Sequence, residues 1–329
     1  MLKQQLLGST APHIRTKQST QEIMWSVSLS LTPVLAFSIY HFGLSALYIT
    51  FISILSCVAV EAICLKLRGK PISAVYDGSA VLTGILLAFN LPPTVPFWLP
   101  IIGAIVAIGI AKQAFGGLGY NIFNPAIAGR CFLLTAWPVE MTSWQVHGVT
   151  SATPLAIFKE QGMHQLISQF NSVPELYWNL ITGTIGGCIG ETSAVLLTIG
   201  AIYLLYKKII SWHIPITYIA SLFVLGYFFA GKDSFCSGDP FFYIFSGGVF
   251  LGAFYMATDM VTSPLTKKGK ILFGFGCGLF TFLIRKFGTY PEGVSYSILL
   301  MNTATPIIDR YLVPKKFGIN KGAAKPNEA

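Results

Sequence analysis

The sequence predicts an all-α integral membrane protein with about ten transmembrane helices, arranged as two inverted five-helix repeats in which some helices are broken. Three observations lead to this prediction: the composition, the apolar runs with their flanking charges, and an internal echo. Apolar residues make up 53% of the 329 residues and charged residues only 11%, whereas a soluble domain carries about 25% charge. A surface so poor in charge favours lipid over water as the solvent.

Ten apolar runs approach the length of about 20 residues that a helix needs to cross a bilayer. The third, fifth and tenth runs contain polar residues, glycine or proline, so we expect these helices to be broken or tilted. The first run is too long for the hydrophobic region of a secretory signal, so no cleavable signal is expected. The predicted spans are 22–40, 44–65, 73–91, 95–112, 121–137, 178–206, 213–230, 241–262, 269–287 and 293–312.

The positive charges indicate the orientation, because lysine and arginine favour cytoplasmic loops. With ten spans and a cytoplasmic N-terminus, 17 of the 22 lysines and arginines fall in cytoplasmic segments, four in extracytoplasmic ones, and Arg130 inside a span. A wrong number of spans would break this alternation partway along the chain. We therefore expect a bacterial or archaeal cell membrane, cytoplasmic termini and an extracytoplasmic segment 138–177.

Composition also excludes some classes of protein. The net charge of +9 lies in short clusters between apolar runs rather than along one soluble face, so no nucleic-acid partner is expected. Five of the six cysteines lie inside apolar runs and none forms a Cys-x-x-Cys pair. We therefore expect buried thiols rather than disulfides or a metal site.

Two short sequence segments in the first half of the chain have similar counterparts in the second half. Residues 77–83, Asp-Gly-Ser-Ala-Val-Leu-Thr, resemble residues 191–198, Glu-Thr-Ser-Ala-Val-Leu-Leu-Thr, and Asn121-Ile-Phe-Asn-Pro125 resembles Asn302-Thr-Ala-Thr-Pro306. Two halves of five spans each would have opposite topology, as in transporters whose broken helices meet near the midplane. Chance similarity of short apolar words is the alternative. The chain is predicted to divide into four parts. These are an N-terminal segment with the first repeat (1–137), an extracytoplasmic loop (138–177), the second repeat (178–312) and a cytoplasmic tail (313–329).

The long loop contains the stretch His147-Gly-Val-Thr-Ser-Ala-Thr153-Pro-Leu-Ala, which by itself is typical of a turn. It resembles the covalent-flavin attachment motif of the membrane family that contains the RnfD component of the Rnf complex and the NqrB component of the sodium-translocating NADH:quinone reductase. That motif is roughly Asp-x-x-Ser/Thr-Gly-Ala-Thr, usually followed by Pro-Leu. Thr150, Ala152 and Thr153 match it, whereas His147 and Ser151 replace its Asp and Gly.

The resemblance implies that a separate flavin transferase esterifies FMN, through its phosphate, to the Thr153 hydroxyl within the attachment motif Thr150-Ser151-Ala152. We expect this hydroxyl on a flexible, accessible loop, because a second enzyme must reach it. Two further segments, 116–126 and 254–264, look like family signatures in the family's order, so the similarity covers nearly all of the chain. The short N-terminus favours the Rnf component over the quinone-reductase component.

Three polar residues in the fifth span are further candidates. Asn121 and Asn124 lie three residues apart, so we expect them to share a helix face. Members of the family can bind a second, noncovalent flavin, and the resemblance implies that these amides contact riboflavin. Hydrogen bonding between helices is the alternative. Arg130 needs a partner, which is either an acid or a flavin.

Ionisable residues at membrane depth are costly and point to function. Asp259 lies among the hydroxyls of Thr258, Thr262 and Ser263. Such oxygens can bind Na⁺ transiently, so Asp259 is the first candidate for an ion path, and no stably bound metal is expected.

Four other carboxylates are weaker candidates for the same path. Asp77 and Glu191 occupy equivalent positions in the echo and could instead cap the starts of broken helices. Glu61 and Asp309 lie near cytoplasmic ends of spans, where an ordinary ion pair with lysine or arginine is the alternative.

The resemblance implies a membrane component of an ion-translocating ferredoxin:NAD⁺ oxidoreductase, which carries electrons through FMN and couples this transfer to Na⁺ or H⁺ movement. No Gly-rich dinucleotide loop or cysteine cluster is present, so partner subunits with iron–sulfur centres and flavins are expected to supply those sites. Two alternatives remain: the quinone-reductase component, with a different acceptor, and a secondary transporter or channel without a cofactor.

Overall fold

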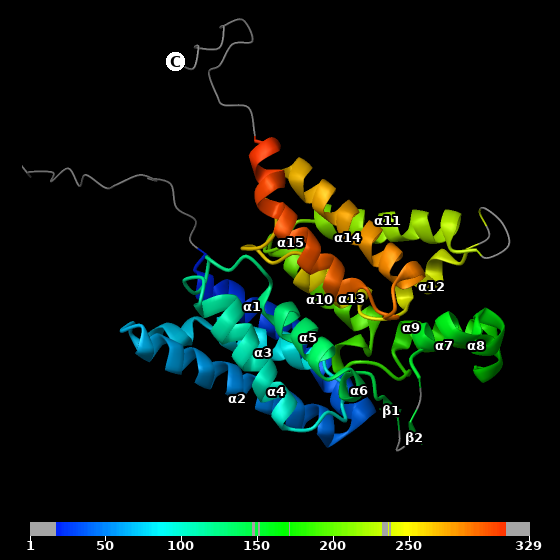
Figure 1. Ribbon diagram of the computed structural model, residues 1–329, viewed down its shortest axis with the longest axis horizontal. Helices are drawn as coiled ribbons and strands as arrows, with labels where there is room; N and C mark the ends of the chain where they lie inside the picture. Colours follow the sequence, from blue (N-terminus) through cyan, green and yellow to red (C-terminus); the bar gives the residue numbers. More distant parts are fainter. Residues whose placement is uncertain are drawn as a thin grey trace, which may run out of the picture.

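The computed structural model describes residues 18–146, 149–150, 152–170, 172–231, 236 and 238–313, and its elements are almost all helical (Figure 1). The N-terminal part contains α1 (Thr20–Phe42), α2 (Leu44–Leu67), η1 (Ile72–Asp77), α3 (Ser79–Phe89), α4 (Trp98–Ala104), η2 (Ile105–Gln113) and α5 (Pro125–Ala136). A connecting part contains α6 (Pro138–Met141), β1 (Gln145–Val146), β2 (Val149–Thr150), α7 (Pro154–Gln161), α8 (Met163–Gln169) and α9 (Val173–Thr182). The C-terminal part contains η3 (Ile189–Glu191), α10 (Ala194–Tyr206), α11 (His213–Phe229), α12 (Pro240–Phe245), α13 (Val249–Leu251), η4 (Gly252–Met256), α14 (Lys267–Phe287) and α15 (Val294–Tyr311).

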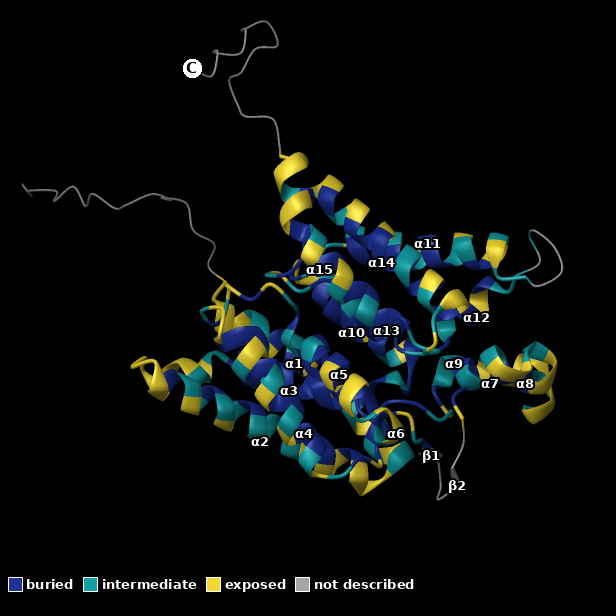
Figure 2. Ribbon diagram, in the orientation of Figure 1, coloured by how far each residue is buried: buried dark blue, intermediate teal, exposed yellow. Residues whose placement is uncertain are grey.

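The prediction of a helical fold is confirmed, apart from the short antiparallel pair β1–β2. Within the described residues, two helices, α1 and α2, are long and apolar enough to cross a membrane each by itself. In α2, the apolar residues Phe51, Leu55 and Ile63 are more than half exposed. Figure 2 shows exposed and intermediate residues along this helix. Several other apolar helices are shorter, with 10–17 residues, so the ten spans stay a prediction.

Broken helices explain part of this shortness, and the sequence predicted some of them. The third predicted span is broken as expected, because Gly78 has a φ of +80° between η1 and α3. The fifth becomes helical only from Pro125. The tenth was predicted to be broken or tilted, and it is not broken: α15 runs through Pro306, which removes one N–H donor without ending the helix.

Two further breaks were not predicted. The sixth span is interrupted between α9 and α10, where Gly183 has a φ of +82°. The eighth span is broken between α12 and α13 at Gly247, whose φ is +65°. Only glycine adopts such backbone angles readily, but the φ of a glycine in an apolar run cannot be predicted from the sequence.

The elements form two groups that meet at the centre of the molecule (Figure 1). Helices α1–α5 form one group, and α11, α14 and α15 belong to the other. Two π-helices, η2 and η4, end beside the contact between the groups, and π-helical turns are frequent at functional sites. The start of α1 and the end of α15 lie toward one end of the molecule, whereas α6–α9 and the β1–β2 pair lie toward the other.

The two sequence echoes have different outcomes. In the first, Asp77 ends η1 before α3 and Glu191 ends η3 before α10, so a 3₁₀ turn precedes an α-helix at both places. In the second, Asn121 precedes α5, which begins at Pro125, whereas its counterpart Asn302 lies inside α15. The first echo therefore has the same local structure in both halves, and the second does not.

Candidate functional site

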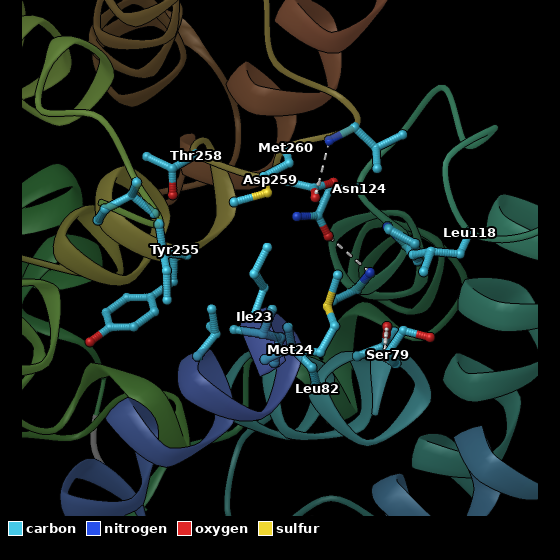
Figure 3. Close-up of a pocket in the computed structure, with 18 of the residues that line it drawn as sticks. Ile23, Met24, Ser79, Leu82, Leu118, Asn124, Tyr255, Thr258, Asp259 and Met260 are labelled. Carbon is cyan, nitrogen blue, oxygen red and sulfur yellow. Dashed lines mark hydrogen bonds between the residues drawn. The ribbon is translucent and has the colours of Figure 1, made fainter. Parts of the chain in front are cut away.

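A central pocket of about 780 Å³, including its open mouth, lies between the α1–α5 group and the segment from η4 to Val261, with α10 also contributing to its lining. Its walls come from α1, α3, η2, residues 118–126, η4 and residues 258–261. Figure 3 shows Asn124 and Asp259 on one side of the pocket and Met24 and Leu82 on the other. The lining is mainly apolar with a few polar groups, which is typical of a small-molecule site.

Asn121 and Asn124 both line this pocket, but they do not share a helix face as predicted. Residues 121–124 are not helical, because α5 begins only at Pro125. The Asn124 Oδ1 accepts from the backbone N–H of Ala126 at 3.1 Å and caps the helix, while its Nδ2 donates to the Met256 carbonyl at 3.2 Å. Asn124 therefore joins α5 to η4 across the pocket, and its amide contributes to structure.

Asp259 lies in the turn after η4 and also lines the central pocket. Its Oδ2 accepts from the Thr262 hydroxyl at 3.1 Å, and its Oδ1 accepts from the backbone N–H of Val261 at 3.5 Å. The nearby Thr258 hydroxyl instead donates to the Phe254 carbonyl. Of the three predicted hydroxyl neighbours, the structure thus brings Thr262 into direct contact with the carboxylate.

The ion pair given as an alternative for Glu61 is present, and its partner is Lys112. The two side chains are 4% and 2% exposed, and Lys112 Nζ lies 2.6 Å from Glu61 Oε1. Lys112 also donates to the Ser79 hydroxyl at 2.6 Å, and Gln113 donates to Glu61 Oε1 at 2.8 Å. Lys112, at the end of the fourth predicted span, is buried because η2 continues through it.

Asp77 and Glu191 behave differently despite their equivalent positions. Asp77 Oδ1 accepts from the backbone N–H of Ser79 at 2.8 Å and from its hydroxyl at 2.6 Å. This carboxylate therefore lies at a helix start, as the capping alternative expected, although the N-cap residue of α3 is Gly78. At the start of α10 the cap is Ser193, and the capping alternative for Glu191 was wrong. Glu191 Oε1 is buried and has no hydrogen-bond partner within the described residues.

Arg130 has an acid as its partner, which settles the open alternative of the sequence. Its guanidinium donates to the Glu292 carboxylate and, at 2.7 Å, to Asn90 Oδ1. Cys188, buried as predicted, lies 3.6 Å from the same guanidinium. Ligand-type atoms of Cys188, Glu191 and Glu292 lie within 4.8 Å of one another. The fifth candidate acid, Asp309, is separate from this cluster and accepts from the backbone N–H of Leu265 at 3.1 Å.

Thr153 lies at the N-terminus of α7. Its hydroxyl accepts from the backbone N–H of Ala156 at 3.2 Å, and Pro154 occupies the first helical position. A threonine followed by proline is a strong start signal for a helix. The hydroxyl was predicted to lie on an accessible loop, but Thr153 is only 5% exposed.

The rest of the attachment motif is described only in part. Thr150 belongs to β2, and Ala152 is exposed. Ser151 and His147, the predicted departures from the motif, lie outside the described residues. The helix α7 is tied to the turn between α14 and α15, because Lys159 Nζ donates to the carbonyls of Gly288 and, at 3.0 Å, of Tyr290.

A second pocket, the α7 pocket, has a volume of about 880 Å³ with its mouth and lies beside this helix. Its lining includes apolar residues of α7 and α12, the end of α11 and three cations. Burial lowers the pKa of one of them, Lys159. The lining residues are Leu155, Phe158, Lys159, Ala230, Gly231, Tyr243, Arg285, Lys286 and Pro291.

Four residues in these clusters were not singled out as site residues by the sequence: Lys112, Cys188, Arg285 and Glu292. Charged residues next to apolar runs are ordinary at the ends of membrane helices, so a single chain gives little reason to choose among them. The isolated Lys112 between two apolar segments was the one available signal. Its significance depends on the packing of η2 against α2, which brings Glu61 to it.

Comparisons with known proteins cover nearly the whole chain. A model described as the NQR2, RnfD, RnfE family matches residues 7–318. The chain is 48% identical over 319 residues to the D component of the proton-translocating ferredoxin:NAD(+) oxidoreductase complex of Clostridium ljungdahlii, covering 95% of this chain and 96% of that protein. It is 49% identical over 322 residues to the D component of the Na(+)-translocating ferredoxin:NAD(+) oxidoreductase complex of Acetobacterium woodii, covering 96% of each.

A more distant relative is the D component of the ion-translocating oxidoreductase complex of Stutzerimonas stutzeri, which is 37% identical over 336 residues, with 92% of this chain and 94% of that protein covered. The resemblance seen in the flavin-attachment motif and the two glycine- and threonine-containing signatures therefore extends from end to end. The chain belongs to the NQR2, RnfD, RnfE family.

Proposed function

We propose that this chain is the RnfD component of an Rnf-type ferredoxin:NAD⁺ oxidoreductase complex, in which it carries electrons through FMN joined to Thr153 and couples their transfer to Na⁺ or H⁺ translocation. The names of its relatives support the role of a membrane component of an ion-translocating oxidoreductase. They include both a proton- and a sodium-translocating complex at nearly equal identity, so the choice of ion does not follow from similarity. Partner subunits supply the iron–sulfur centres, further flavins and the sites for ferredoxin and NAD⁺.

The placement of Thr153 is the observation that carries this proposal. A helix N-terminus attracts anions, because its free N–H groups and the helix dipole point toward the added charge. The Thr153 hydroxyl lies at that position of α7, within hydrogen-bond distance of the N–H of Ala156. A phosphoester on this oxygen would keep its remaining oxygens beside the same N–H groups. The local structure therefore fits a phosphate, and FMN supplies the electron-transfer chemistry when bound.

Burial of the Thr153 hydroxyl has a consequence for maturation. An oxygen in a residue that is 5% exposed, and engaged as a helix cap, is out of reach of a second enzyme. We infer that the flavin transferase acts while α7 is undocked, before Lys159 anchors the helix to the turn between α14 and α15. Anchoring then holds the modified threonine in place, since Lys159 contacts two carbonyls of that turn.

The proposal includes ten spans in two inverted repeats, cytoplasmic termini and an extracytoplasmic flavin loop. Contacts at one end of the molecule support it, because they join helix ends that the ten-span order places on the cytoplasmic side. The end of α10 meets the start of α1, the start of α14 meets the end of α15, and the end of α2 meets the end of η2. The contacts are Lys207–Ser26, Leu265–Asp309 and Lys70–Gly116.

Contacts at the other end join the segments that this order places outside. The α3–α4 connection meets the segment after α6, α7 meets the α14–α15 turn, and α9 meets the start of α12. The contacts are Thr94–Ser143, Lys159–Tyr290 and Tyr177–Asp239. Broken helices that meet in the interior are also typical of proteins that move ions across membranes.

The central pocket is the proposed place for the second flavin and for the ion. Asn121 lines it beside apolar side chains of α1 and α3, which suits a flat ring such as that of riboflavin, while Asn124 holds its wall in place. Asp259, on the same wall, is the proposed ion ligand. If Asp259→Asn leaves the Na⁺ dependence of electron transfer in the complex unchanged, the ion assignment is wrong.

The flavin assignment is tested by a denaturing gel viewed under ultraviolet light, with the protein co-expressed with its flavin transferase. We expect a fluorescent band from the wild type, a band from Thr153→Ser, which keeps a hydroxyl, and none from Thr153→Val. A colourless wild type would overturn the proposal in favour of a cofactor-free transporter. A fluorescent band combined with quinone reduction by the assembled complex would instead indicate the quinone-reductase component.

A further inference from the structure

The α7 pocket has several cations and no carboxylate among the described residues of its lining. The cations are Lys159, Arg285 and Lys286. In the described part of the chain, none of the three forms a salt bridge. Their hydrogen bonds go to backbone carbonyls, which orient the cations but do not neutralise them. The pocket is therefore suited to an anionic or electron-rich ligand.

Arg285 is the residue that points most clearly to such a ligand. Its side chain is buried, and its two terminal nitrogens donate to the carbonyls of Tyr243 and Ser246 at the end of α12. Its Nε is buried and has no hydrogen-bond partner within the described residues. A buried donor of this kind is costly unless something pairs with it. Stabilising the end of α12 explains the terminal nitrogens but leaves the Nε unexplained.

The pocket also lies next to the proposed attachment point. Leu155, two residues after Thr153, lines it and packs against Gly247 at the break between α12 and α13, where an added Cβ would lie 2.8 Å from the leucine side chain. Phe158 and Tyr243 pack edge to face, with ring centroids 6.1 Å apart, and add aromatic surface to its lining. Aromatic surface beside cations suits a flat aromatic ring that has carbonyl groups on one edge.

We propose that the α7 pocket receives the isoalloxazine ring of the flavin joined to Thr153, with the carbonyl-bearing edge of the ring facing Arg285, Lys159 and Lys286. This inference rests on the proposed function and extends it from the attachment point to the ring. Reduction adds electron density to that edge, so nearby positive charges stabilise the reduced flavin more than the oxidised one. The three cations therefore raise the reduction potential of this flavin, and each acts as a positioning and tuning residue.

Lys286 offers the cleanest test, because its side chain is exposed and donates only to the Phe229 carbonyl at the pocket rim. In the purified complex, the midpoint potential of the covalent flavin is measured by spectroelectrochemistry for the wild type, Lys286→Gln and Lys159→Gln. Lys70→Gln is the matched control, since Lys70 is also an exposed lysine that donates to a carbonyl, that of Gly116, at the opposite end of the molecule. The other flavins of the complex serve as an internal reference.

We expect each pocket variant to keep its fluorescent band on a denaturing gel and to lower the potential of this flavin. A tenfold loss of preference for the reduced flavin corresponds to a fall in midpoint potential of about 30 mV for a two-electron couple. The midpoint potential should not change in Lys70→Gln. Unchanged potentials in both pocket variants, with the flavin attached, would overturn the inference and leave the proposed function standing. Loss of a tightly bound anionic phospholipid from the variants, seen by native mass spectrometry without any shift in potential, would overturn it in favour of a lipid-headgroup site. A wild type without covalent flavin would refute the proposed function itself.

Discussion

The buried pair Glu61–Lys112 connects α2 to η2 beside the central pocket, and its removal gives a sharp test of the fold. Lys112→Met keeps most of the apolar stem and removes the ammonium group. The variant leaves Glu61 with one remaining donor to Oε1, the amide of Gln113, and with an Oε2 that already lacks a partner among the described residues. It also removes the donor to the Ser79 hydroxyl.

The expected cost follows from the burial of both side chains, which are 2% and 4% exposed. Breaking a buried ion pair by removing one partner costs about 3–5 kcal/mol, because the other charge stays buried and unpaired. Replacing both partners removes that penalty. We therefore expect Lys112→Met to destabilise by about 3–5 kcal/mol and the double variant Lys112→Met/Glu61→Gln to destabilise by less than Lys112→Met alone.

The assay is unfolding by SDS in mixed micelles, monitored by helical circular dichroism, with the free energy of unfolding compared across the cycle of four proteins. Lys70→Met is the control for loss of a lysine at the same end of the molecule. It is exposed, and surface substitutions usually change stability by less than about 0.5 kcal/mol. A Lys112→Met variant as stable as the control, or a double variant less stable than both single ones, would refute the reasoning.

Two other predictions use the same assay. Gly183→Ala should prevent accumulation of folded protein, because its φ is +82° and an added Cβ would lie 0.7 Å from the Thr192 carbonyl oxygen. Gly43→Ala is the control, because Gly43 has a φ of +76° but no atom within 4 Å of an added Cβ, so this variant tests the backbone angle without the clash. Equal behaviour of the two glycine variants would contradict the clash. Tyr177→Phe removes a hydrogen bond to Asp239, which also caps α12, and should cost about 1.5–3 kcal/mol, with the exposed Tyr206→Phe as control. Burial and this hydrogen bond raise the pKa of Tyr177. Its contribution to the free energy of unfolding is therefore full below the ordinary tyrosine pKa of about 10 and is lost as the pH rises through the raised pKa. If the wild type stays more stable than Tyr177→Phe by the same amount at strongly alkaline pH, this reasoning is wrong.

Much of the candidate site could be predicted from the sequence where the signal was local. Thr153 was found through the family motif and was expected on a flexible loop; the proline after it is a local helix-start signal, and the structure places Thr153 at the start of α7. Capping was the alternative given for Asp77, and its carboxylate does accept from the N–H of Ser79, two residues away. Predictions of this kind depend on neighbours within a few residues, whose geometry the chain itself restricts.

Predictions failed where a distant partner or a backbone angle decided the outcome. The helix face expected for Asn121 and Asn124 does not form, because α5 begins one residue after Asn124, at Pro125. The accessible threonine is buried because α7 packs against residues far along the chain, such as Tyr243 and Gly247. The partner of Arg130 is Glu292, 162 residues away, and no pattern in the sequence pairs them.

The sequence by itself determined that the chain is helical and rich in lipid-compatible surface, and that it belongs with one family of redox proteins. Predictions from composition and from apolar runs average over many residues, so they depend little on the local structure of any one residue. Only the tertiary structure decided where the helices break, which acidic side chains are buried without a hydrogen-bond partner, and which cations line the α7 pocket. Those features depend on a few glycine angles and on contacts between residues far apart in the chain, and such contacts exist only after the helices have packed.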